Sequence, residues 1–207
     1  MTTAENNSTD TPKKNYTALW IMIFLFGLPY LAAYYFYFNR DDMNLGAQTN
    51  YGTIINPVRQ LEDTSLTLID DSEFKLSSLR GKWIMFSVGS SDCKASCQDN
   101  LYKIRQIKTA LAAEHKRVKK AFFLTDVKAI DSFNELLKDY RDMHVIIPSG
   151  SNYKDYLSPL SVDGKTIEDG IFVIDPLGNY MMSFPKDAEA KKILKDMERL
   201  LKISKIG

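Results

Sequence analysis

The stretch from Ala18 to Phe38 carries no charged residue, and this feature constrains the chain more than any other. A helix that crosses a bilayer needs about 20 mostly apolar residues, and this stretch has that length. Gly27 and Pro29 are compatible with such a helix, since both residues are frequent in membrane helices. Trp20 at one end and tyrosines at the other fit the aromatic belts of the two membrane interfaces. The alternative of a buried core helix does not suit so long an uncharged run near the terminus.

A cleaved signal peptide is the second alternative for this stretch. Its apolar region would span roughly 7–15 residues and end at a small-residue cleavage site. This run is longer, and no such site stands clear of its bulky aromatic residues. The sequence therefore predicts an uncleaved transmembrane anchor over residues 17–38, preceded by a polar tail over residues 1–16.

The charges that flank the anchor predict its orientation. Lys13 and Lys14 precede it, whereas Arg40 on the far side stands beside two aspartates. The positive-inside rule then places the tail in the cytoplasm and exports everything after Phe38.

The overall charge is nearly balanced, with 27 Lys and Arg against 26 Asp and Glu. A nucleic-acid-binding domain would normally show a clustered basic excess, so we expect no nucleic-acid partner. The run from Lys116 to Lys120 is interpreted as a solvated surface. A hydrophobic content of 44% is enough for one globular domain behind the anchor.

Residues 39–58 are polar and predict a linker, and residues 59–207 alternate between strand and helix patterns. Period-two and apolar runs predict strands at Leu66–Asp70, Trp83–Val88, Ala121–Val127, Val145–Pro148, Gly170–Asp175 and Asn179–Phe184. Helices are predicted at Gln98–His115, Asp131–Tyr140, with Asp131 as N-cap, and Ala188–Ile203. The last two strands should form a hairpin. This order predicts an α/β domain with a sheet flanked by helices.

The only two cysteines, Cys93 and Cys97, follow the strand Trp83–Val88 and precede a helix, where α/β folds place ligands and chemistry. A helix N-terminus and Lys94 would favour a thiolate there, whereas Asp92 would oppose it. In a regular helix the two Cβ atoms would lie about 5–6 Å apart. A disulfide needs about 3.8 Å, hence local unwinding or a non-helical first turn. Two thiolates can hold copper(I) or zinc with less strain, so the spacing favours a metal and leaves a disulfide switch or a structural staple open.

A metal held by two sulfurs usually takes a further ligand. His144, which begins a predicted strand, is the candidate third ligand for copper(I) beside Cys93 and Cys97. His115 belongs to the basic surface run EHKRVKK. Met143, Met181 and Met182 are soft ligands in principle, but a methionine in an apolar strand is more often part of the core.

The segment LRGKWIMFSVGSSDCKASC, the preceding anchor and the later IFVIDPLGNYMMSFP resemble the Sco/SenC proteins of the thioredoxin-like superfamily. The resemblance implies a thioredoxin-like domain, with a central sheet flanked by helices, in the periplasm and anchored in a bacterial inner membrane. It also implies a role in copper delivery to, or thiol reduction of, the dinuclear copper centre of cytochrome c oxidase. The implied partner is an oxidase subunit or another oxidase assembly factor.

Two departures from the family pattern qualify what the resemblance implies. Sco proteins place a copper-binding histidine just before the late strand, whereas VDGKTIEDGIFVIDP contains none. Glu168 and Asp169 offer oxygen ligands that suit copper(I) poorly. Gly170 stands where a typical thioredoxin has proline. Peroxidase activity is not expected, because Phe86 occupies the proline position of peroxiredoxins.

Three functions therefore stay open. The first is a cytochrome c oxidase assembly factor that uses Cys93 and Cys97 for thiol–disulfide chemistry or transient copper handling. The second is a general membrane-tethered thiol–disulfide oxidoreductase, in which Cys93 attacks and Cys97 resolves the mixed disulfide. The third is a non-catalytic interaction module with a structural disulfide.

Overall fold

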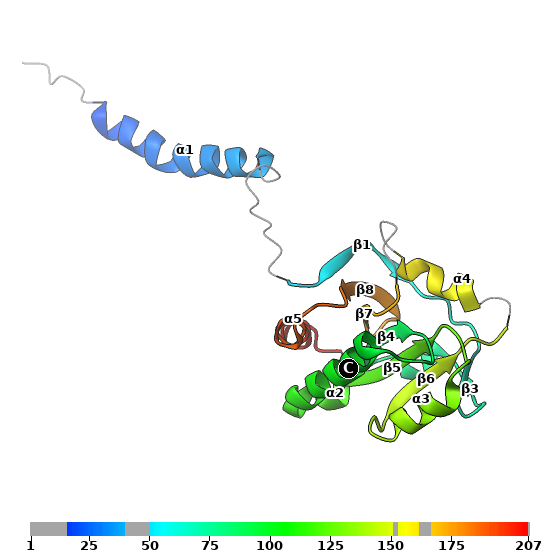
Figure 1. Cartoon of the computed structure of the whole chain (residues 1–207). Coiled ribbons are helices and arrows are strands. Elements are labelled where there is room, and N and C mark those ends of the chain that lie inside the picture. Colours follow the sequence, from blue (N-terminus) through cyan, green and yellow to red (C-terminus); the bar gives the residue numbers. More distant parts are fainter. Residues whose placement is uncertain (1–15, 40–49, 151–152, 162–166, 207) are drawn as a thin grey trace, which may run out of the picture. The chain divides into compact units, whose positions relative to one another are not determined.

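The computed structural model describes residues 16–39, 50–150, 153–161 and 167–206 (Figure 1). It divides into two units, residues 1–49 and residues 50–207. The first unit contains helix α1 (Thr17–Phe38), which buries none of its side chains and has a mean hydropathy of 1.7 over its most apolar window. The helix is long and apolar enough to span a membrane, as predicted. The tail before residue 16 and linker residues 40–49 lie outside the described residues.

The second unit is built on one eight-stranded sheet with the order β1-β8-β7-β4-β5-β6-β2-β3. Strands β4, β5 and β6 run parallel, and every other neighbouring pair is antiparallel. The central strand β4 is buried along its whole length, as its continuous apolar sequence predicts. The strands are β1 Thr53–Gln60, β2 Leu66–Leu68, β3 Glu73–Phe74, β4 Trp83–Gly89, β5 Val118–Leu124, β6 Met143–Ile147, β7 Ile171–Ile174 and β8 Asn179–Phe184.

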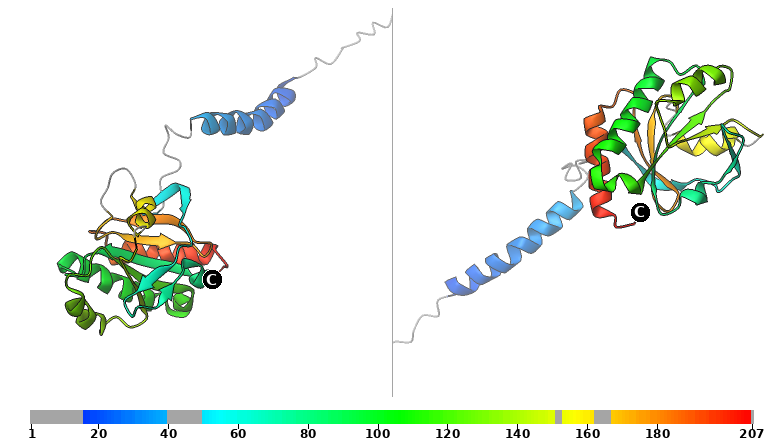
Figure 2. Two further views of the ribbon diagram at one scale, coloured as in Figure 1. Left: turned by 90° about the vertical axis from the view of Figure 1, so that its right-hand side faces the viewer. Right: turned by 90° about the horizontal axis from the view of Figure 1, so that it is seen from below.

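Helices cover both faces of this sheet, and Figure 2 shows α2 and α5 on one side and α4 on the other. The helices are α2 Ala95–Ala110, α3 Ile130–Leu137, α4 Tyr153–Leu157 and α5 Ala190–Ile203, with short 3₁₀ segments η1 Leu76–Leu79, η2 Ala112–Arg117 and η3 Ser158–Leu160. Alternate residues of β4 enter opposite cores. Phe86 belongs to the same core cluster as Tyr156 of α4, whereas Met85 belongs to the cluster that contains Ile104 of α2. These two cores enclose the sheet.

The structure confirms the predicted α/β fold and the hairpin of its last two strands. It also contains β3 and α4, which were not predicted, and places β5 three residues earlier than predicted. Helix α2 ends at Ala110, so that His115 lies in η2 and not in the predicted helix. Three further differences have a clear local cause or consequence. Strand β1 (Thr53–Gln60) occupies part of the predicted linker. It forms a strand because it pairs with β8, and its own sequence does not indicate this pairing. Helix α2 begins at Ala95, three residues before the predicted start. The N-cap of α3 is Ala129, and Asp131 lies within the first turn.

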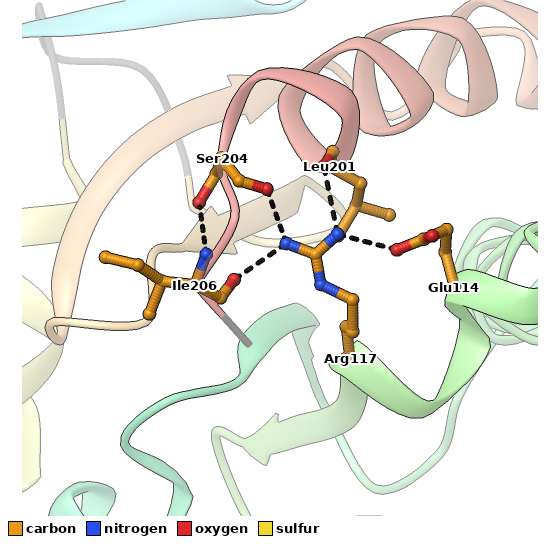
Figure 3. A network of polar contacts seen from close by, with 5 residues as sticks. All are labelled: Glu114, Arg117, Leu201, Ser204 and Ile206. Atoms are coloured by element: carbon orange, nitrogen blue, oxygen red, sulfur yellow. Dashed lines mark hydrogen bonds and ion pairs between the residues drawn. The ribbon is translucent and has the colours of Figure 1, made fainter.

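Arg117 fastens the end of α5 to the segment before β5 (Figure 3). Its guanidinium donates hydrogen bonds to the carbonyl oxygens of Leu201, Ser204 and Ile206 at 2.9, 2.6 and 2.8 Å. It also pairs with the Glu114 carboxylate at 2.6 Å. Carbonyls in the last turn of a helix have no intrahelical donors, so this one side chain acts as a C-terminal cap.

Asp196 of α5 holds the residues at the N-terminal end of the second unit. It is 2% exposed and accepts hydrogen bonds from the backbone N–H groups of Tyr51 and Gly52, at 2.7 and 2.8 Å. A buried carboxylate is tolerated when donors satisfy it in this way. The residues that lead into β1 are therefore tied to α5.

Candidate functional site

Cys93 and Cys97 form a disulfide immediately beyond the carboxyl end of β4, with Cα atoms 5.1 Å apart. Cys93 lies outside α2 with a φ of 29°, and Cys97 lies in the first turn of that helix. Positive φ is uncommon for residues other than glycine. This non-helical placement of Cys93 is the local departure from helical geometry that a disulfide between residues four apart requires.

Hydrogen bonds hold the turn that carries Cys93. The Cys93 N–H donates to the Ser90 carbonyl at 3.2 Å, and the Gln98 amide donates to the Cys93 carbonyl at 2.9 Å. Ser91, which is 1% exposed, donates to the Asp126 carboxylate at 2.5 Å and accepts from the Ala129 N–H at 2.8 Å. Ser91 therefore joins the cysteine turn to the segment that follows β5.

Both cysteines are buried, with 2% of Cys93 and 3% of Cys97 exposed. They pack in one apolar cluster with Leu101 of α2 and with Phe122 and Leu124 of β5. A buried sulfur cannot be attacked in line by an external thiol without local movement. Exchange with a partner therefore requires the turn that carries Cys93 to open.

The charges around the turn act mainly on each other. Lys94 pairs with the Asp92 carboxylate at 3.3 Å, and its side chain is 85% exposed. A hydrogen bond from Ser90, followed by the contact with Lys94, holds the pKa of Asp92 below its ordinary value. Among the residues that the structure describes, no side chain caps the N-terminus of α2. The unpaired N–H groups and dipole of this helix are thus the positive influence available to a Cys93 thiolate.

A buried polar group that sequence reasoning missed lies next to Cys97. Ser87 of β4 donates to the Gly170 carbonyl at 2.7 Å, and the Asn100 amide donates to the Asp169 carbonyl. Both side chains are 0% exposed, and Asn100 Oδ1 has no hydrogen-bond partner among the described residues. The signal in the sequence is a polar residue on an otherwise apolar face, at Asn100 beside Leu101 and Ile104. This group links the cysteine helix to the segment before β7.

Gly170 occupies the position next to β7 because no side chain fits there. A Cβ atom on Gly170 would lie 2.7 Å from the ring of Phe172. That ring stacks on Phe86 with centroids 5.2 Å apart. Asp169 precedes it with a φ of 60°, and its carboxylate and Cys97 Sγ both lie near Gly89. The proline of a typical thioredoxin would collide with the aromatic core here.

The structure does not bring His144 to the cysteine pair. His144 pairs with Ala121 on the face of the sheet that carries Phe86, and its ring stacks on Phe74 at 5.6 Å. Its neighbour Val145 points to the opposite face and packs in the cluster of Cys93 and Cys97. Burial, and then the nearby Lys119 and Lys108, lower the pKa of His144.

The other soft side chains considered from the sequence belong to the core. Met182 is fully buried, and Met143 and Met181 pack against the core clusters. In the described part of the chain, no three or more His, Cys, Asp and Glu side chains are grouped so as to hold a metal ion. The donors present in this conformation therefore do not fit a resident copper site.

Comparison with solved structures identifies the fold. Apo Sco1 from Thermus thermophilus matches with a TM-score of 0.61 at 17% identity, over 74% of this chain and 98% of that one. Copper-bound ScoI from Arabidopsis thaliana matches at 0.57 and 15%, over 70% and 99%. The thioredoxin domain of a thiol-disulfide oxidoreductase from Bacteroides vulgatus matches at 0.53 and 13%, over 68% and 94%.

No curated protein sequence matches this chain. The solved structures confirm that the Sco/SenC resemblance and the thioredoxin-like prediction hold at the level of the fold. The family model described as "Transmembrane-like, thioredoxin-like, C-terminal domain" matches residues 83–204, which include β4, the cysteine pair, the hairpin and α5. The chain therefore belongs to the transmembrane-like, thioredoxin-like C-terminal domain family.

Proposed function

We propose that this protein is a membrane-anchored thiol–disulfide reductant on the exported side of a bacterial inner membrane. Its substrate is a disulfide at the copper site of cytochrome c oxidase, in an oxidase subunit or another assembly factor. The Cys93–Cys97 disulfide at the junction of β4 and α2 carries the proposal, because a reductant of this kind ends its turnover in that state. In this proposal residues 17–38 are the anchor and residues 1–16 face the cytoplasm.

The reaction starts from the reduced pair. The Cys93 thiolate, favoured by the N-terminus of α2, attacks one sulfur of the partner's disulfide and releases the other as a thiolate, which takes up a proton. Cys97 then loses its proton and attacks Cys93 Sγ, which releases the second partner thiol. Two electrons pass from the chain to its partner, one of the two protons comes from Cys97 and the other from solvent, and the chain is left with the Cys93–Cys97 disulfide.

A second candidate function is transient carriage of copper(I) as cargo on the reduced pair. The copper-bound ScoI of Arabidopsis thaliana, which shares the fold, favours this candidate. The ligands would be the two thiolates, because His144 faces the other side of the sheet. The burial of both sulfurs favours a further alternative, in which the disulfide is only structural. The reduction potential of the pair separates a structural disulfide from a thiol reductant or a copper carrier.

The test uses the full chain in an uncharged detergent, equilibrated with dithiol and glutathione buffers and then trapped with a mass-tagged maleimide. We expect a reduction potential above about −300 mV, the region below which structural disulfides fall. Reduced protein should then reduce an oxidised copper-site domain of an oxidase subunit. Cys97→Ser should trap the mixed disulfide, and Cys93→Ser should not.

If the Cys93–Cys97 disulfide stays oxidised in redox buffers below about −300 mV, the proposal is wrong and the disulfide is structural. The copper candidate is tested by anaerobic titration with copper(I) against a competing chelator. Binding should be lost in Cys93→Ser and in Cys97→Ser and be unchanged in His144→Ala. Loss of binding in His144→Ala would contradict the placement of that residue.

A further inference from the structure

A hollow of about 530 Å³ lies at the end of the sheet remote from the cysteines. It is formed by the end of α2, by η2 and by the starts of β5 and β6. The cysteines follow the opposite end of β4, whose seven residues extend for roughly 20 Å. The hollow is therefore separate from the redox site. Its lining residues are Lys108, His115, Lys116, Val118, Lys119, Asp142 and His144.

The lining is strongly cationic, although the whole chain has a net charge of only +1. Three lysines and a single carboxylate, that of Asp142, line it, together with two histidines that add positive charge only when they are protonated. Within the described residues, no ion pair joins Lys108, Lys116 or Lys119 to an acidic side chain. Like charges gathered in a concave surface raise the local concentration of anions.

Near two of these residues, Lys108 and Asp142, lies a buried lysine, Lys120, contrary to the expectation that the whole run from Lys116 to Lys120 is solvated. Lys120 is 5% exposed, and its ammonium donates to the Arg141 carbonyl at 2.6 Å. Burial, and then the neighbouring Lys108, lower the pKa of Lys120, and burial also lowers the pKa of Lys108. A buried cation is costly unless an anion is close to it.

His115 is oriented so that it can contribute a donor. Its Nδ1 lies against the Ala112 carbonyl, an acceptor, so Nδ1 carries the hydrogen of that contact. Nε2 is then the ring nitrogen left to meet a ligand, and it becomes a donor when the ring is protonated. Phosphate oxygens accept bonds from lysine and histidinium donors of this kind.

From the hollow, its charges and the buried lysine close to Lys108, we propose that residues Lys108, His115, Lys116, Lys119 and His144 form a binding site for a phosphate-bearing anion. The volume, within the range of about 300–1,000 Å³ for small-molecule sites, exceeds what a single phosphate needs. The ligand class is therefore a small molecule with two or more phosphate charges, or an anionic phospholipid headgroup. This site is independent of the proposed thiol chemistry.

The test uses the two histidines as reporters, since the chain contains no others and both line the hollow. Full-length protein with isotope-labelled histidine rings is titrated with inorganic pyrophosphate in an uncharged detergent at constant ionic strength. We expect the ring signals of His115 and His144 to move and the pKa of His144 to rise. Lys108→Gln and Lys119→Gln should each weaken binding about tenfold, the scale of one charge-assisted hydrogen bond. The exposed Lys191→Gln is the matched control and should have no effect.

A second arm identifies the source of the phosphate. The same spectra are recorded in lipid nanodiscs of phosphatidylcholine alone and of phosphatidylcholine with phosphatidylglycerol. Movement of the histidine signals with phosphatidylglycerol alone assigns the site to a lipid headgroup, and movement only with pyrophosphate assigns it to a soluble ligand. The proposal is overturned if neither condition moves the signals. It is also overturned if Lys108→Gln, Lys116→Gln and Lys119→Gln all bind pyrophosphate as tightly as the unaltered chain does.

Discussion

Replacing Ser91 with alanine should make the turn that carries Cys93 open more often. The side chain makes two hydrogen bonds, one to the Asp126 carboxylate and one from the Ala129 N–H. A hydrogen bond to a charged group contributes about 1.5–3 kcal/mol, and a neutral one about 1 kcal/mol. Part of this loss is recovered, because water can reach Asp126 and the Ala129 N–H once the turn opens. We therefore expect the free energy of local opening to fall by about 2 kcal/mol.

If the disulfide is reduced from the open turn, the reduction rate follows the population of that state. A fall of about 2 kcal/mol corresponds to a rate about 30-fold higher, since every 1.4 kcal/mol is a factor of ten. The assay adds dithiothreitol to the full chain in detergent and traps free thiols with a mass-tagged maleimide over time. Urea unfolding of the same protein, followed by the fluorescence of the buried Trp83 in a Trp20→Phe background, reports global stability separately.

Ser149→Ala is the matched control, because Ser149 also makes a part-buried hydrogen bond, to Thr67 at 2.7 Å, away from the cysteines. It should leave the reduction rate unchanged. The reasoning fails if Ser91→Ala reduces no faster than the unaltered chain. It also fails if the rate rises only in proportion to a loss of global stability, because reduction would then occur from the unfolded state.

Arg117→Met should lower the free energy of unfolding by about 2–4 kcal/mol in urea titrations, because three carbonyls lose their donor, whereas Glu114→Gln should cost under about 1 kcal/mol. Equal losses would contradict the capping role. Gly170→Ala should cost about 1–3 kcal/mol, since Phe172 must move, and unchanged thermal stability would refute this steric argument. In phosphate-free buffer, stability should fall as the pH drops below about 6.5, because the unfolded chain binds a proton that the half-buried His144 takes up only at lower pH. His144→Phe keeps the ring on Phe74 and should reduce this pH dependence, and an unaltered profile would show that other groups cause it.

Much of the architecture could be predicted from the sequence, because the pattern of apolar residues in the central strands and helices matches the pattern of their burial. The continuous apolar run of β4 and the amphipathic pattern of α5 were both confirmed, and the anchor's length was sufficient to predict a membrane-spanning helix. Strand β1 could not be predicted, because its order comes from pairing with β8 and from Asp196, which is far away in the sequence.

The candidate site was predicted only in part, for similar reasons. The position of Cys93 and Cys97 between a strand and a helix was predictable, but the geometry that lets them form a disulfide depends on a positive φ that no residue type at Cys93 indicates. The placement of His144 depends on the register between β5 and β6, and a shift of one residue would have turned it to the cysteine face. Asn100 and Ser87 become significant only when β7 lies beside β4.

The attachment of Tyr51 and Gly52 to Asp196 determines how mechanical force would enter the domain. A pull on the chain from the side of α1 reaches the two hydrogen bonds to Asp196 first, and then the pairing of β1 with β8 at the edge of the sheet. Two strands, β8 and β7, separate that edge strand from β4, which leads to the cysteines. Tension from the side of α1 would thus be carried first by β1, β8 and α5, and would reach the cysteines through the packing of α5 on α2 before it reached them through β4.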